Sequence, residues 1–138
     1  MFEIDTIHHV SLPVTDLERS KAFYGEIFGL NEIERPPSDS PGAWYQLGDR
    51  QLHLIASEDS TFRKGKVVDD RDIHFALRVT NYSEMRKFLL SKGFHPEADD
   101  ELKKMKESPG VTSGLPRLHI MDPDRNVIEL SAEQLDAG

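Results

Sequence analysis

The feature that most constrains the fold of this chain is an internal repeat. His74 lies 65 positions after His9, and Phe88 lies 65 positions after Phe23. In both halves an alternating apolar segment is followed by one whose apolar residues recur at helical spacing. We therefore expect one domain, residues 1–138, built from two similar modules at 5–57 and 71–133.

Each half is predicted to begin with a strand and to close with a hairpin. Apolar and polar residues alternate at 7–14 and again at 72–79, which is the period of a half-buried strand. Paired strands are predicted at 43–56, around a Gly-Asp turn, and at 117–132, around the turn DPDRN. The two hairpins occupy equivalent places in the two modules.

A helix is predicted after the first strand of each half. Thr15 with Glu18, and Asn81 with Glu84, have the spacing of capping pairs at a helix start. Apolar residues then recur at helical spacing, and a glycine follows each run where it would end a helix. Both halves therefore read strand, helix, strands.

Two segments carry no regular pattern. Residues 57–71 are polar and charged, and they predict a linker between the modules. Residues 103–116 are rich in Gly, Ser, Pro and Lys, the composition of a mobile loop. We expect this loop to cover a site.

Composition excludes several classes of function. The chain has no cysteine, so disulfides, thiolate nucleophiles and iron–sulfur sites are excluded, and any metal must be held by His, Asp or Glu. A net charge of −8 argues against nucleic acid as a partner. No apolar run reaches the roughly 18 residues of a membrane helix, and the acidic N-terminus does not resemble a secretory signal. We expect a cytoplasmic protein that acts on a small molecule and binds neither nucleic acid nor membrane.

Chemistry is expected on the polar face of each predicted sheet, opposite the face that the helix covers. His9 and His74 occupy equivalent positions on the first strands. On the hairpin strands His53 corresponds to Glu129, because the apolar residues that flank them also correspond. The four equivalent positions thus hold three imidazoles and one carboxylate.

These four side chains are suitable ligands for one divalent metal ion. Imidazoles with a carboxylate favour Zn, Ni, Co, Mn or Fe over Mg and Ca. If the two halves form one curved sheet about a pseudo-twofold axis, the four converge at its centre. Two adjacent positions of an octahedral ion then stay open, or three if His53 does not bind.

Three further residues are candidates for the site. His119 lies opposite Glu129 if the hairpin is symmetric about its loop. It is then either an outer partner of the metal site or a simple cross-strand neighbour of Glu129. Arg78 and Arg117 share the polar face and are candidates for binding an anionic substrate. His8 lies on the apolar side of its strand and is not expected to be a ligand.

Four segments together resemble the vicinal oxygen chelate superfamily, which includes glyoxalase I, fosfomycin-resistance thiol transferases, extradiol dioxygenases and bleomycin-binding proteins. The segments are IHHVSLPVTDLERSKAFYGEIFGL, QLHLI, DIHFALRV and DPDRNVIEL. The resemblance implies an α+β fold of paired βαβββ modules, forming an eight-stranded cupped sheet, or half-open barrel, with helices on its outer face. It places the family's metal positions at His9 and His53 in one module and at His74 and Glu129 in the other.

Two residues depart from the pattern of glyoxalase I-like proteins. His53 stands where these proteins usually carry a carboxylate, which argues against a mechanism with two flanking carboxylates. Arg125 stands at the glycine of their DPDGN turn, where a residue with a side chain is less easily accommodated.

The resemblance and the metal set together predict a glyoxalase-like lyase or isomerase. The ion would bind two neighbouring substrate oxygens and stabilise the enediolate that proton abstraction leaves. The resemblance makes Glu129 the predicted general base, and His119 is the reserve candidate.

Three alternatives remain open. In an extradiol-type dioxygenase, His9, His74 and Glu129 would hold Fe(II) and His53 would act as an acid–base group. A thiol transferase of the fosfomycin kind would use the same three ligands. A bleomycin-type binding protein needs no metal, so the full ligand set argues against it. We expect a homodimer, with each site formed within one chain or across two.

Overall fold

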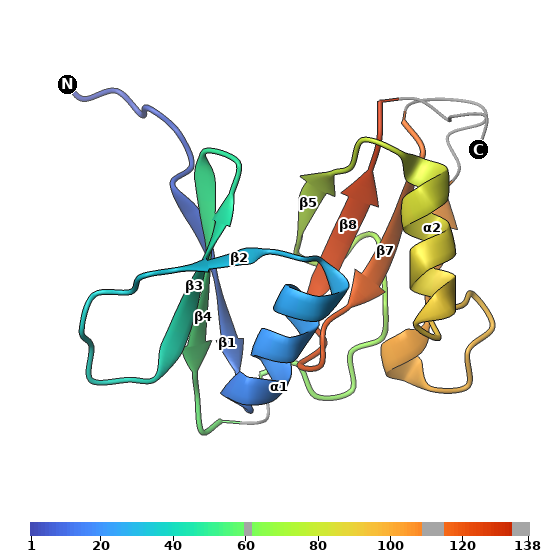
Figure 1. Cartoon of the computed structure of the whole chain (residues 1–138), viewed down its shortest axis with the longest axis horizontal. Helices are drawn as coiled ribbons and strands as arrows, with labels where there is room; N and C mark the ends of the chain where they lie inside the picture. The colour runs from blue at the N-terminus through green and yellow to red at the C-terminus, as the bar shows by residue number, and fades with distance from the viewer. Residues whose placement is uncertain (60–61, 109–114, 134–138) are drawn as a thin grey trace. The chain divides into compact units, whose positions relative to one another are not determined.

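The chain folds into two compact units, Met1–Phe62 and Arg63–Gly138 (Figure 1). The structure, a computed structural model, describes residues 1–59, 62–108 and 115–133. Residues 109–114 of the predicted loop lie outside the described residues. Within the described ranges, no helix combines the length and the apolar character needed to span a membrane.

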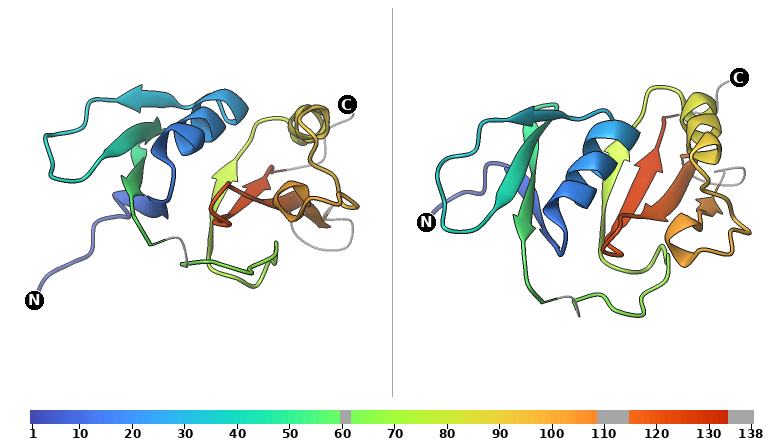
Figure 2. Two further views of the ribbon diagram at one scale, coloured as in Figure 1. Left: turned by 90° about the horizontal axis from the view of Figure 1, so that it is seen from below. Right: turned by 60° about the horizontal axis from the view of Figure 1, so that its bottom comes forward.

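The first unit contains one four-stranded sheet among residues 1–59. Its strand order is β1-β4-β3-β2, with β1 parallel to β4 and the other neighbours antiparallel. The α-helix continues directly into a π-helical turn and packs against β3 and β4 (Figure 2). In chain order the elements are β1 (His9–Val14), α1 (Leu17–Ala22), η1 (Phe23–Ile27), β2 (Asn31–Ile33), β3 (Gly42–Leu47) and β4 (Arg50–Ala56).

The second unit repeats this plan in the residues that the structure describes. Its sheet has the order β5-β8-β7-β6, again with one parallel pair, β5 and β8. Both units have the βαβββ order, so the predicted repeat and the α+β class are confirmed. In chain order the elements are β5 (His74–Arg78), α2 (Tyr82–Ser91), the 3-10 turn η2 (Glu101–Lys103), β6 (Lys106–Ser108), β7 (Arg117–Met121) and β8 (Val127–Ser131).

The strand registers confirm the predicted equivalence of His53 and Glu129. Ser11 of β1 pairs with His53, and Ala76, which lies 65 positions after Ser11, pairs with Glu129. The two side chains therefore occupy the same position in two copies of one module. The sequence alone was therefore enough to predict that His53 and Glu129 lie on equivalent strands.

Alternating side chains on the central strands form the core of each unit. Leu52 and Leu54 of β4 are fully buried in the first unit. Ile128 and Leu130 of β8 are buried in the second, beside Leu118 of β7. Because side chains alternate along a strand, His53 and Glu129 are directed to the opposite face from these neighbours.

The first helix starts one residue later than the capping pattern predicted. Asp16, and not Thr15, is the N-cap, because Oδ1 of Asp16 accepts from the Arg19 main-chain N–H at 3.1 Å. The Thr15 hydroxyl instead accepts from the Arg19 guanidinium at 3.1 Å. In the second helix the prediction is confirmed, since Oδ1 of Asn81 accepts from the Glu84 N–H at 2.9 Å.

Two strands lie in segments that the sequence pattern did not assign to strands. β2 (Asn31–Ile33) follows the first helix, and β6 (Lys106–Ser108) lies within the segment predicted as a loop. Each is three residues long and forms an edge of its sheet. Three residues are too few to show an alternating pattern above chance.

Candidate metal centre

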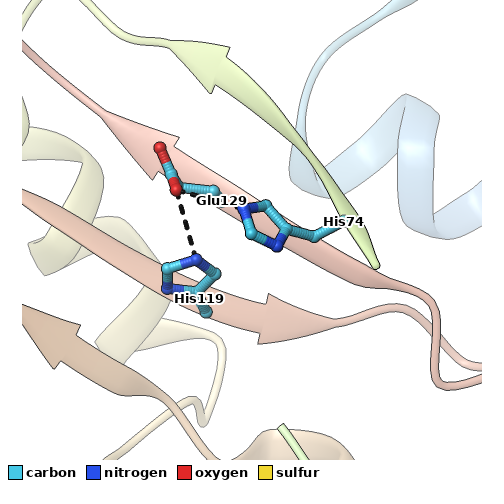
Figure 3. Close-up of side chains that lie close together, drawn as sticks. All are labelled: His74, His119 and Glu129. Carbon is cyan, nitrogen blue, oxygen red and sulfur yellow. Dashed lines mark ion pairs between the residues drawn. The ribbon is translucent and has the colours of Figure 1, made fainter. Parts of the chain in front are cut away.

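Three side chains of the second unit meet on one face of its sheet (Figure 3). His74 is the first residue of β5, whereas His119 and Glu129 are the middle residues of β7 and β8. Strand β8 lies between the other two, and Glu129 pairs with His119 across the antiparallel ladder. The predicted pairing of His119 with Glu129 is confirmed.

The atoms of this cluster have the spacing of ligands that share a cation. Nε2 of His74 lies 3.3 Å from Oε1 of Glu129, and Nε2 of His119 lies 3.2 Å from the same oxygen. One ligand atom from each residue lies within 4.8 Å of the others. Atoms bound at about 2.1 Å to one ion, at angles of roughly 90–110°, lie about 3.0–3.4 Å apart. Both pairs that include Glu129 therefore have the spacing of ligands that share a divalent ion.

His119 is buried without a hydrogen-bond partner. Its side chain is 1% exposed, and neither ring nitrogen makes a hydrogen bond within the part of the chain that the structure describes. Nε2 is close to Glu129, but the two groups are not oriented for a hydrogen bond. Burial lowers the pKa of His119, and this outweighs the opposing effect of the Glu129 carboxylate. The neutral imidazole is favoured, which is the form that binds metals.

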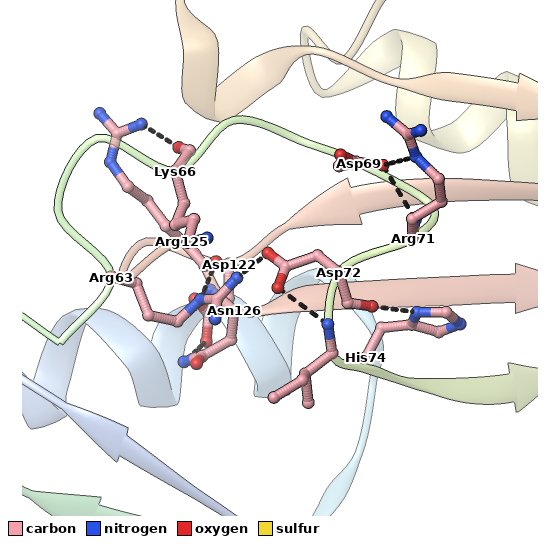
Figure 4. A network of polar contacts seen from close by, with 10 residues as sticks. Arg63, Lys66, Asp69, Arg71, Asp72, His74, Asp122, Arg125 and Asn126 are labelled. Atoms are coloured by element: carbon pink, nitrogen blue, oxygen red, sulfur yellow. Dashed lines mark hydrogen bonds and ion pairs between the residues drawn. The ribbon is translucent and has the colours of Figure 1, made fainter.

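His74 is oriented by a hydrogen bond on the far side of its ring (Figure 4). Its Nδ1 donates to the main-chain carbonyl oxygen of Asp72 at 2.8 Å. Because a carbonyl only accepts, Nδ1 carries a proton, and Nε2 is the nitrogen that faces Glu129. Metal-binding histidines are typically fixed in this way.

A polar network holds the segment that precedes His74 (Figure 4). The Asp72 carboxylate pairs with the guanidinium of Arg63, and its Oδ1 accepts from the Ile73 N–H at 2.8 Å. Arg63 also donates from Nε to the Arg125 carbonyl oxygen at 2.6 Å. The second part of the predicted linker, from Arg63 on, is thus bound to the β7–β8 turn of its own unit.

In the first unit, His9 and His53 belong to an aromatic stack. The His53 ring lies between Trp44, at a centroid distance of 3.9 Å, and His9, at 4.0 Å. Its Nε2 is hydrogen-bonded to Oε1 of Gln51 at 2.8 Å. Burial lowers the pKa of His53, with smaller contributions from neighbouring histidines and Arg35.

The structure brings the four predicted ligands together in two pairs. His9 and His53 are in contact within the first unit, and His74 and Glu129 are in contact within the second. The two pairs belong to different units, so the combined four-ligand site stays a prediction.

Arg78 and Arg117 lie on the same face as the cluster. Both pair with Ser131 of β8, two residues beyond Glu129, so their side chains leave the sheet on the Glu129 side. Arg78 forms an exposed ion pair with Glu133 at 3.1 Å. The shared face is confirmed, and a role in substrate binding stays a prediction.

Sequence reasoning missed three contributors to these sites. Trp44 is the cross-strand partner of His53, and a symmetric hairpin about its Gly-Asp turn would have revealed it. His8 was set aside, yet its Nδ1 lies 2.9 Å from Nδ1 of His9. Asp72 acts through its main-chain carbonyl, for which the sequence gives no signal.

Comparisons with known proteins agree with this architecture. The family model described as Glyoxalase/Bleomycin resistance protein/Dioxygenase superfamily matches residues 6–130. A protein of Arabidopsis thaliana named Glyoxylase I 4 is 26% identical over 129 residues, which cover 92% of this chain and 70% of that protein.

Two solved structures share the fold. A protein from Bacillus anthracis described as a glyoxalase family protein superposes with a TM-score of 0.74 at 22% identity, covering 96% of this chain and 98% of that one. A mutant of the fosfomycin resistance protein FosX from Listeria monocytogenes, complexed with Mn(II) and 1S,2S-dihydroxypropylphosphonic acid, has a TM-score of 0.69 at 22% identity, covering 94% and 93%. The chain belongs to the Glyoxalase/Bleomycin resistance protein/Dioxygenase superfamily.

Proposed function

We propose that this chain is a divalent-metal-dependent enzyme of the glyoxalase-like class. It acts as a lyase or isomerase on a small substrate with two adjacent oxygens. The observation that carries the proposal is the cluster of His74, His119 and Glu129, in which two imidazole Nε2 atoms lie 3.2–3.3 Å from one carboxylate oxygen. The likeness to a protein named Glyoxylase I 4 supports the class of reaction.

The proposed ligands come from both units. His74 and Glu129 hold the ion from the second unit, and His9 holds it from the first. Two residues are candidates for a fourth position: His53, which is the equivalent of Glu129 in the repeat, and His119, which lies beside Glu129. The ion is one of Zn, Ni, Co, Mn or Fe, a range that includes the Mn(II) of the FosX complex.

Glu129 is the proposed general base. When bound, the ion polarises a substrate carbonyl and stabilises the negative charge that develops on its oxygens. Glu129 accepts the proton from the carbon beside that carbonyl, and the C–H electron pair moves toward the carbonyl oxygen. Return of the proton to the former carbonyl carbon, with transfer of the hydroxyl proton from its oxygen to the former carbonyl oxygen, completes an isomerisation. His119 is the second candidate for this proton transfer, because its Nε2 lies 3.2 Å from Glu129.

Arg78 and Arg117 are proposed to bind an anionic group of the substrate. They lie on the cluster's face of the sheet, and guanidinium groups bind carboxylates and phosphonates through paired hydrogen bonds. The exposed partner of Arg78, Glu133, is readily displaced because such ion pairs contribute little in water.

Deuterium exchange tests this proposal. The metal-loaded chain is incubated in D₂O with 2-hydroxyketones and with thiol adducts of 2-oxoaldehydes, and exchange is followed by proton NMR. We expect deuterium beside the carbonyl with the wild-type chain and none with Glu129→Gln. Oxygen uptake on a catechol would indicate a dioxygenase instead. Tight ligand binding without turnover would indicate a binding protein.

A second candidate is the opening of a small phosphonate epoxide of the fosfomycin kind. The two arginines on the cluster's face favour it, as does the complex of FosX with a dihydroxypropylphosphonic acid. A thiol or water would add to one epoxide carbon, the C–O bond would break, and the oxygen would take up a proton. Loss of fosfomycin in ³¹P NMR, without deuterium exchange on the carbonyl substrates, would favour this reaction.

We also propose that the chain forms a homodimer, since closed twofold dimers are the commonest oligomers. Light scattering coupled to size exclusion measures the mass directly. The single chain has a mass of 15.7 kDa, so a dimer is expected at twice this value. A mass equal to that of one chain would contradict the proposal.

A further inference from the structure

We propose that His119, and not His53, is the fourth protein ligand of the metal ion. Three of the four ligands then come from the second unit: His74, His119 and Glu129. The inference rests on the proposed function, because it concerns the ion that function requires. It replaces His53 with His119 in the ligand set that the internal repeat predicts.

The first observation is the unsatisfied state of His119. Its side chain is 1% exposed, and both ring nitrogens lack a hydrogen-bond partner among the described residues. A buried polar atom without a partner destabilises the folded chain. A cation beside Nε2 would satisfy the nitrogen that faces Glu129.

The second observation is the common geometry of the two histidines in the second unit. Both direct Nε2 at Oε1 of Glu129, at 3.3 Å for His74 and 3.2 Å for His119. Their rings are perpendicular, with centroids 4.8 Å apart. Three strands that are neighbours in one sheet supply the three groups, which fixes their spacing.

The third observation is that His53 is already engaged in its own unit. Its Nε2 is bonded to Gln51, and its two ring faces are covered by Trp44 and His9. Binding an ion through Nε2 would break the bond to Gln51, and turning the ring would break both stacking contacts. His119 has no hydrogen bond to lose among the described residues, and its ring contact is with His74, another residue of the cluster.

The assignment also explains how Glu129 can serve as a base. A carboxylate that leaves the ion becomes a stronger base, because the cation no longer stabilises its charged form. With His74, His119 and His9 still binding, Glu129 can move away without release of the ion. His119 is then a ligand and no longer a candidate for proton transfer.

Metal titration of matched histidine variants tests the inference in the full chain. Mn²⁺ affinity is measured by calorimetry, and Co²⁺ coordination by visible absorption, for the wild type and for His119→Gln and His53→Gln. His95→Gln is the control, since His95 lies outside the cluster and accepts a hydrogen bond from the Glu97 N–H. Thermal melting shows whether each variant is folded.

We expect His119→Gln to weaken Mn²⁺ binding by at least the roughly 10–100-fold that loss of an outer partner costs. Its Co²⁺ spectrum should also change, while His53→Gln and His95→Gln resemble the wild type. If His119→Gln does not fold, ¹⁵N NMR of the wild-type chain replaces it as the test of the ligand assignment. On addition of Zn²⁺ the ¹⁵N chemical shift of Nε2 of His119 must change, and the chemical shifts of the ring nitrogens of His53 must not.

Three results would overturn the inference. Weaker binding in His53→Gln with unchanged binding in His119→Gln would restore the ligand set of the repeat and leave the proposed function intact. Equal losses in both variants would also contradict the replacement of His53 by His119. Failure of the wild-type chain to bind any of the ions would remove the metal-dependent function as well.

Discussion

Nδ1 of His74 donates a hydrogen bond to the main-chain carbonyl oxygen of Asp72, 2.8 Å away. This bond leaves Nε2, which faces Glu129, as the ring nitrogen that can bind a metal. Asp72 is itself held by Arg63, whose guanidinium pairs with the Asp72 carboxylate. Arg63, at the start of the second unit, thus positions the candidate metal ligand His74 through Asp72.

Replacing Arg63 with methionine is expected to weaken metal binding. Arg63 and Asp72 have side chains only 16% and 14% exposed, so the substitution leaves a largely buried carboxylate without its cation. We expect a loss of stability of about 1–3 kcal/mol and a roughly 10-fold or greater loss of Mn²⁺ affinity. Urea unfolding and calorimetric titration measure the two effects.

Arg71→Met is the matched control for that experiment. Arg71 has a side chain that is 86% exposed, and among the residues that the structure describes it pairs with its near neighbour Asp69. Stability and metal affinity should both stay at the wild-type values. Equal effects of the two substitutions would show that Arg63 does not position His74.

Replacing Glu129 with glutamine is expected to remove activity while the fold is kept. The amide has nearly the shape of the carboxylate but no charge, so it is a poor metal ligand and cannot accept the proton. Turnover should fall below detection, and the melting temperature of the metal-free chain should change little. Glu26→Gln, at an exposed position of the π-helical turn, is the control. Residual turnover near the wild-type rate would contradict both roles of Glu129.

Arg125 in the β7–β8 turn illustrates what the sequence could predict. The sequence marked this position as one where glycine would be easier, and Arg125 does adopt a φ of 67°. The side chain compensates through contacts with residues distant in the chain, the Lys66 carbonyl at 2.5 Å and the Glu101 carboxylate at 2.8 Å. The strain was predictable from local sequence, whereas the compensating contacts depend on the tertiary structure.

Glycine and alanine at position 125 should differ in stability. Both Arg125→Gly and Arg125→Ala lose the contacts of the side chain, but only alanine keeps a Cβ in the left-handed region. We expect the glycine variant to be more stable than the alanine variant by about 1 kcal/mol. Urea unfolding of the two proteins measures the difference, and an alanine variant of equal or greater stability would contradict the strained turn.

The aromatic stack of the first unit gives an optical test. Trp44 is the one tryptophan of the sequence, and its ring is parallel to that of His53 within 1°. His53→Ala exposes that face of the indole to water, so the emission maximum should move to longer wavelength. His95→Ala should leave the emission unchanged. An unshifted spectrum in His53→Ala would show that the two rings are not stacked in solution.

The repeat explains why much of the fold and part of the site could be predicted. Equivalent strands and the correspondence of His53 with Glu129 follow from one offset along the chain, and the α+β class follows from the family resemblance. The sequence placed His119 opposite Glu129, but its proposed role as a metal ligand did not follow, because its counterpart in the first unit is Trp44, which is not a ligand candidate. Its importance depends on burial and on a missing hydrogen bond, which only the folded sheet reveals.

Anomalous diffraction from crystals of the Mn²⁺- or Zn²⁺-loaded chain tests the metal site most directly. The account predicts one strong peak per chain, about 2.0–2.2 Å from Nε2 of His74, Nε2 of His119 and a carboxylate oxygen of Glu129. A peak bound to His53 without His119, or no peak at this cluster in metal-loaded crystals, would contradict it.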